Sequence, residues 1–114
     1  MRTDDLITVH LVARLWSVID AQTDNVVSLA AVDGNEDEVQ TGTAIREAGW
    51  AQVPWVDGQW PPMDDEISIS LTRSQWEFAM HHLERSDASY QRIGDQESLE
   101  LGRRARATVK PQLG

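Results

Sequence analysis

The side chains best suited to acid–base or metal chemistry lie between residues 77 and 84. If this stretch is helical, His81 shares one face with Glu77 and Glu84, at spacings of four and three residues. One imidazole and two carboxylates could hold a divalent metal ion or transfer a proton. This face lies away from the apolar face, however, and mixed charge on an outer helix face is typical of solvated surface. We therefore expect no catalytic residue, no cofactor and no metal ligand here.

Other catalytic patterns give no positive signal either. The chain has no cysteine, so a thiol nucleophile and a Cys-ligated zinc site are excluded. It has no Gly-x-Ser-x-Gly elbow, and the run "GNEDE" offers carboxylates where a phosphate needs backbone amides and a lysine. The sequence thus gives no reason to expect an enzyme.

Three of the five tryptophans fall in the stretch "AGWAQVPWVDGQWPP". Trp50 follows a glycine that we expect to end a helix, which favours packing of its indole in the core. Trp55 and Trp60 flank Asp57-Gly58, a dipeptide that favours a tight hairpin turn. The sequence leaves two interpretations open for these two indoles. They either pair across the hairpin within the core, or form an exposed patch beside Met63 and its neighbouring prolines.

A second candidate interaction surface is the basic edge of the last helix. Its members are Arg103, Arg104, Arg106 and Lys110. Cations near a helix C-terminus complement the helix dipole, which is the simpler interpretation. The functional alternative is a grip on an acidic partner or on the acidic half of a second copy.

The elements that would position these residues indicate one α+β domain over residues 1–114. Residues 6–20 fit both a strand and a helix, and the polar run "QTDN" that follows favours a β-hairpin over residues 6–33. One short helix is expected from the N-cap Asn35 to Gly49, then a small hairpin around residues 57–58. The alternating "EISISLT" predicts a strand, and the Thr72/Gln75 capping box begins a helix that Gly94 ends. Asp95 caps a last helix that Pro111 terminates, so residues 73–110 form an antiparallel helical hairpin. No internal repeat is recognisable.

The charge and composition of the chain limit the kinds of partner that it can bind. The net charge is −9, and residues 1–66 hold thirteen acids against three arginines. This balance disfavours direct nucleic-acid binding. The first residues match neither a signal peptide nor a membrane span. We expect a cytoplasmic protein with a protein partner and no membrane association, with a homodimer also plausible.

Three hypotheses for function follow. The first is a non-enzymatic interaction or regulatory module that uses the Trp/Pro loop at residues 54–63 and the last helix. The second is an acidic nucleic-acid mimic that inhibits a DNA-binding protein through residues 20–66. The third is a small-molecule enzyme or binding protein with a tryptophan-lined pocket.

Overall fold

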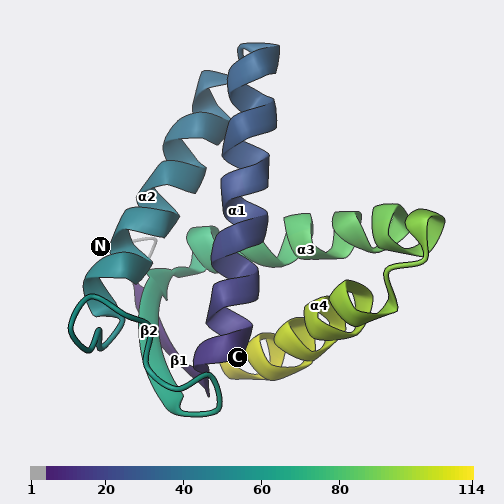
Figure 1. Cartoon of the computed structure of the whole chain (residues 1–114). Helices are drawn as coiled ribbons and strands as arrows, with labels where there is room; N and C mark the ends of the chain where they lie inside the picture. The colour runs from purple at the N-terminus through teal and green to yellow at the C-terminus, as the bar shows by residue number, and fades with distance from the viewer. Residues whose placement is uncertain (1–4) are drawn as a thin grey trace.

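The computed structural model describes residues 5–114 and shows an α+β fold, a two-stranded antiparallel sheet with four helices (Figure 1). The elements in chain order are β1 Leu6–Val12, α1 Ala13–Asp33, α2 Glu36–Gln52, β2 Glu66–Thr72, α3 Arg73–Ile93, α4 Gln96–Val109 and a 3-10 turn, Lys110–Leu113. The helices form two hairpins, α1–α2 and α3–α4, which diverge from the sheet like the arms of a V. Within the described residues, no helix is long and apolar enough to cross a membrane.

The sheet buries one face against the helices and leaves the other open. Val9 lies opposite Ile69 in the register, and both are fully buried. Alternate residues point to the open face because side chains in a strand alternate between its two faces. There Thr8 hydrogen-bonds Ser70 at 2.6 Å, and the His10 ring bonds Ser68 at 2.8 Å.

The predicted N-terminal β-hairpin is wrong, because the strand ends at Val12 and helix α1 begins at once. The first turn of α1 has no side-chain cap. Its free amides are satisfied from elsewhere in the chain. The Ala13 and Arg14 N–H groups donate to the backbone oxygens of Asp65 and Met63, each at 2.9 Å. The groups that cap the start of α1 lie about fifty residues later in the chain, so the sequence around residue 13 does not indicate that a helix begins there.

The polar run that resembled a turn lies inside α1, where Thr23, Asp24 and the preceding Asp20 have partners. The Thr23 hydroxyl donates to the Ile19 carbonyl one helical turn earlier, at 2.8 Å. Arg46 on α2 donates to the carboxylates of Asp20 and Asp24, at 3.1 and 3.0 Å. This tertiary pairing offsets the weak helix propensity of the segment.

Helix α2 begins as predicted but is longer than expected. Asn35 caps it through the Glu38 N–H. Gly49 does not end the helix, which continues to Gln52. Instead, Gly49 and Gly42 allow α1 and α2 to approach closely. A Cβ atom added at Gly49 would lie 2.0 Å from Trp16 Cζ2, and one at Gly42 would lie 2.5 Å from Val27 Cγ2.

The prediction for the second half is confirmed. β2 spans the alternating segment, and Thr72 and Gln75 form the capping box at the start of α3. Gly94 closes α3 in the left-handed conformation, and Asp95 caps α4 through the Ser98 N–H. Helices α3 and α4 form the expected hairpin, and Pro111 lies in the 3-10 turn that follows α4.

The two halves of the chain are structural repeats, which corrects the expectation that no repeat is present. β1 and β2 are each seven residues long, α1 and α3 are each 21, and corresponding residues lie 60 positions apart. The positions that keep the same residue are Asp4/Asp64, Asp5/Asp65, Ile7/Ile67, Leu11/Leu71, Trp16/Trp76, Gly34/Gly94, Gly42/Gly102, Arg46/Arg106 and Gln52/Gln112. Residues 41–50 of α2 and the corresponding residues 101–110 have the same pattern of buried and exposed positions. The chain is therefore a duplicated strand–helix–helix unit.

The repeats are arranged about an approximate two-fold axis at the centre of the sheet. Val9 and Ile69, which correspond, are paired there. The corresponding indoles of Trp16 and Trp76 meet edge to face behind the sheet, with centroids 6.1 Å apart, and both are fully buried. The hydrophobic core is thus built by equivalent side chains from both halves.

Each repeat closes the outer sheet edge of the other. The Gln52 side chain, at the end of α2, accepts from the Ser70 N–H at 2.6 Å and donates to the Ser70 carbonyl at 2.8 Å. Gln112 makes the same two bonds to His10 on β1, both at 2.9 Å. These amides occupy backbone groups that would otherwise be free to pair with another strand.

Candidate functional site

The segment that departs from the repeat is residues 53–65, which join α2 to β2. It contains a small hairpin in which Val56 pairs with Gln59, and Asp57 and Gly58 form the turn with positive φ angles of 52° and 76°. Two successive positive φ angles are typical of a type I′ turn, the one that Asp-Gly favours. The hairpin predicted around residues 57–58 is therefore confirmed.

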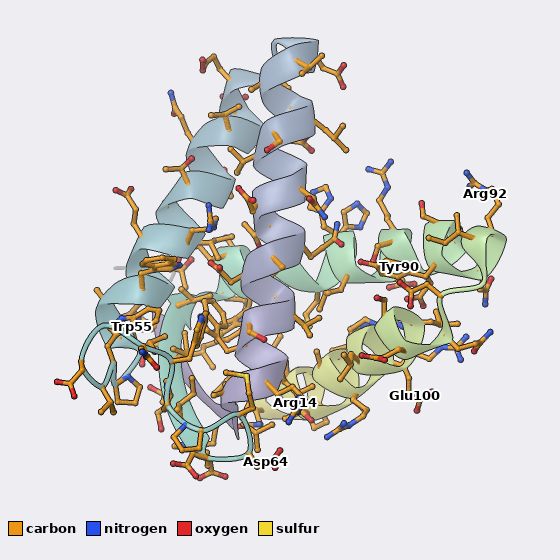
Figure 2. The ribbon with its side chains drawn as sticks, in the orientation of Figure 1. Arg14, Trp55, Asp64, Tyr90, Arg92 and Glu100 are labelled. Carbon is orange, nitrogen blue, oxygen red and sulfur yellow. The ribbon has the colours of Figure 1, made fainter. Side chains whose placement is uncertain are left out.

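Three indoles lie in a row from the end of α2 into this segment, and we call Trp50, Trp55 and Trp60 the tryptophan patch. The ring centroids of Trp50 and Trp55 are 5.1 Å apart, and those of Trp55 and Trp60 are 4.9 Å apart. The rings are tilted by 49° and 55°, an arrangement favoured over face-to-face stacking. Figure 2 shows Trp55 on the loop that follows α2, close to the end of that helix.

Hydrogen bonds hold the patch in place. The Trp55 Nε1 donates to the Trp50 carbonyl at 2.8 Å, and the Trp50 Nε1 donates to the Asp20 carboxylate at 3.2 Å. The same carboxylate accepts from Arg46, and this hydrogen bond raises the pKa of the guanidinium above its ordinary value. Asp20 is 7% exposed, so a buried ion pair orients an indole at the surface.

The expected roles of the tryptophans were only partly right. Trp50, predicted to be core, has 49% of its surface exposed. It points outward because Asp20, which we expected in a strand or turn, lies on α1 and holds its indole nitrogen. Trp55 and Trp60 pair across the hairpin as one interpretation required. They are half-buried, and with Met63 they pack against the core while remaining partly accessible.

Comparison with known proteins returned no match to any family model, any curated protein or any solved structure. The chemistry of this chain must therefore be judged from its own geometry.

The predicted basic edge of α4 is divided by its ion pairs. Arg103 and Arg104 are exposed. Arg106 is half-buried and donates to Asp87 at 2.6 Å, so it braces α4 against α3. Lys110 approaches Glu84 at 3.7 Å and keeps about half of its side chain exposed. Two arginines and part of one lysine remain available to a partner.

The two histidines of α3 face different surroundings. His81 is exposed, whereas His82 is buried beside Glu38 of α2, with 3.6 Å between Nε2 and the carboxylate. Burial lowers the pKa of His82 below its ordinary value, and Glu38 offsets part of this effect. Among residues 5–114, no three His, Asp or Glu side chains come together as a metal site. The stripe of His81, Glu77 and Glu84 thus gathers no such group.

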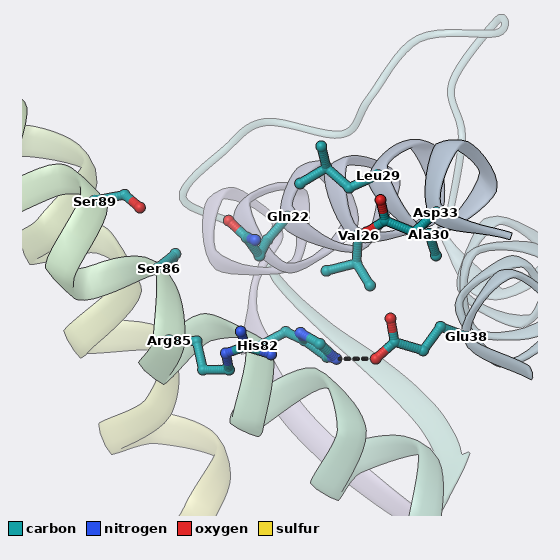
Figure 3. Close-up of a pocket in the computed structure, with 10 residues that line it drawn as sticks. All are labelled: Gln22, Val26, Leu29, Ala30, Asp33, Glu38, His82, Arg85, Ser86 and Ser89. Atoms are coloured by element: carbon teal, nitrogen blue, oxygen red, sulfur yellow. Dashed lines mark ion pairs between the residues drawn. The ribbon is translucent and has the colours of Figure 1, made fainter. Parts of the chain in front are cut away.

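Two grooves are candidates for a small ligand. One lies between α1 and α3, with a volume of about 300 Å³, and His82 and Glu38 at its floor (Figure 3). Its lining residues are both polar and apolar. The other, of about 330 Å³, lies beside the tryptophan patch between α1 and α2. Only Trp50 of the three indoles lines it, together with Val27, Thr43, Arg46 and Glu47.

Proposed function

We propose that this chain is a small non-enzymatic interaction module that binds a protein partner through the tryptophan patch. The observation that carries the proposal is the exposure of Trp50, fixed by Asp20 and continuous with two further indoles. Tryptophan is enriched among the residues that contribute most to binding at protein interfaces. An indole already held in one orientation loses little conformational entropy when a partner binds it.

The repeat supports the same surface. The tryptophan patch ends one repeat and occupies the connection to the next. At the corresponding place in the second half, Lys110 replaces Trp50 and a short 3-10 turn follows. The aromatic surface is therefore specific to one half and is not a requirement of the strand–helix–helix unit.

Capture from a lysate of the source organism tests this proposal. The tagged chain of residues 1–114 is compared with Trp50→Ala and with the control Leu29→Ala, which removes a side chain of 67% exposure on α1 away from the patch. We expect wild type and Leu29→Ala to recover the same protein, and Trp50→Ala to lose it. Circular dichroism and thermal melting establish that all three are folded. Equal recovery of that protein by Trp50→Ala would contradict the proposal.

The two other hypotheses from the sequence, a nucleic-acid mimic and a small-molecule binding protein, stay predictions. The acidic residues of α1 nearest the patch, Asp20 and Asp24, are paired with Arg46. They are thus less available as phosphate mimics than the sequence suggested.

A further inference from the structure

The segment that carries the tryptophan patch holds acidic charge only. Between positions 47 and 66 there are five carboxylates and no basic residue: Glu47, Asp57, Asp64, Asp65 and Glu66. Glu47 lines the groove beside Trp50, and Asp57 forms the turn between Trp55 and Trp60. Asp64 pairs with Arg14 at 3.3 Å (Figure 2). Within residues 5–114, Glu47 and Asp57 make no ion pair.

Among the described residues, the cation that lines the groove beside Trp50 is already neutralised. Arg46 lines the same groove, but its guanidinium is shared between Asp20 and Asp24. The carboxylate of Glu47, which lines the groove beside Trp50, therefore gives the surface around the exposed indole a negative potential.

The second repeat shows what this place on the fold looks like with the opposite charge. A groove at the corresponding position of the α3–α4 hairpin is lined by Arg103, Arg106 and Lys110, together with Glu84, which lies 3.7 Å from Lys110. Counting back 60 positions, Arg103 corresponds to Thr43 and Lys110 to Trp50, while Ala107 replaces Glu47. The two equivalent surfaces therefore differ in chemistry. The groove of the first repeat carries the indole of Trp50 and the carboxylate of Glu47, where that of the second carries the ammonium of Lys110 and the guanidinium of Arg103.

We infer that the ligand of the tryptophan patch is a cationic, arginine-bearing segment of another protein, an assignment that rests on the proposed function above. Indole faces attract cations through the ring quadrupole, and a guanidinium also stacks on them. Glu47 and Asp57 lie where they can pair with the same side chains. A second copy of the chain is a poorer occupant, since two molecules with a net charge of −9 repel each other.

Calorimetric titration of the full chain tests the chemistry. The probe is a blocked peptide of arginines alternating with glycines, and its control replaces every arginine by citrulline, which keeps the shape and removes the charge. We expect the citrulline peptide to bind at least about tenfold more weakly. Trp50→Ala should weaken arginine-peptide binding by about tenfold and Glu47→Gln by about threefold.

A matched variant separates a specific site from general attraction to an acidic protein. Glu36 lies at the other end of α2, about 21 Å from Trp50 along the helix axis. We expect Glu36→Gln to bind the arginine peptide as wild type does, within a factor of about 1.5. Equal weakening by Glu36→Gln and Glu47→Gln, or equal binding of the two peptides, would overturn the inference.

Sedimentation of the chain alone tests the other occupant. A concentration-dependent dimer that Arg103→Glu and Trp50→Ala both dissociate would identify a second copy as the occupant and refute a foreign segment. A monomer at all concentrations supports the assignment. If Trp50→Ala loses its lysate partner but the two peptides bind alike, the proposed function stands and only the cationic ligand is rejected.

Discussion

The contact between Gly49 and Trp16 gives the sharpest test of how the two helices of the first repeat pack. An alanine Cβ at position 49 would lie 2.0 Å from Trp16 Cζ2 and 2.8 Å from Cε2, whereas carbon atoms pack at about 3.5 Å or more. Trp16 is fully buried against the core and has no room to withdraw. The substitution therefore forces α1 and α2 apart by about 1.5 Å at this point.

Two opposing terms decide the outcome for Gly49→Ala. Replacing glycine by alanine inside a helix contributes about 0.8–1 kcal/mol of stability. Overpacking a buried contact costs about 1–3 kcal/mol, and a displacement of this size belongs at the upper end. We expect a net loss of about 2 kcal/mol, which lowers the melting temperature by roughly 8 °C for a chain of this size.

Gly102→Ala is the matched control, because a Cβ there has Asp87 Oδ1, at 3.9 Å, as its nearest neighbour. Only the helix term applies, so this variant should gain about 1 kcal/mol and melt roughly 4 °C higher. Thermal and urea unfolding of both variants provide the measurement. If Gly49→Ala is stabilised like Gly102→Ala, the close approach of the two helices is not as described.

Three further predictions concern the core, the sheet edges and pH. Trp76→Phe should cost about 1 kcal/mol more than Trp16→Phe in urea unfolding, because Trp76 Nε1 donates to the Ile7 carbonyl at 2.9 Å. The buried Trp16 Nε1, by contrast, finds no acceptor among the described residues; equal costs would speak against this assignment. Gln52→Ala and Gln112→Ala should each lower the free energy of unfolding by about 1–2 kcal/mol. Each variant should also self-associate more readily at high concentration, as measured by light scattering. Unchanged light scattering would show that the sheet edges need no closure. His82 has a pKa lowered by burial, so the unfolded chain binds its proton more readily and stability falls as the pH drops below about 6.5. His82→Gln, which installs the residue found at the corresponding position 22, should flatten the stability profile between pH 7 and 5, and an unchanged slope would assign it to other groups.

Local signals explain which elements could be predicted from the sequence. Each of the signals found as expected acts on backbone groups only a few residues away. They are the capping box of Thr72 and Gln75, the closing Gly94 and the N-cap Asp95. The start of α1 could not be predicted in this way. Its first amides are capped by the carbonyls of Met63 and Asp65, far along the chain, so no capping residue precedes it.

The candidate site was predicted in part for the same reason. Asp57-Gly58 indicated the hairpin and the pairing of Trp55 with Trp60. The exposure of Trp50 depends on Asp20, thirty residues earlier, whose place on a helix the sequence did not indicate. The repeat is not evident from the sequence because the shared residues are few and widely spaced. A recurring tryptophan followed eighteen residues later by glycine, at positions 16/34 and 76/94, was the signal available.

The reciprocal closure of the sheet edges has a consequence for how the chain folds during synthesis. β1 leaves the ribosome before the other described elements, yet its strand partner lies about 60 residues later and its edge is closed by Gln112, 102 residues after His10. Such distant pairings delay folding until most of the chain is available. The α1–α2 hairpin emerges with its core-facing side uncovered, since the indole that meets Trp16 belongs to the second repeat. Neither repeat can complete its own sheet edge, so the two halves must acquire their native structure together.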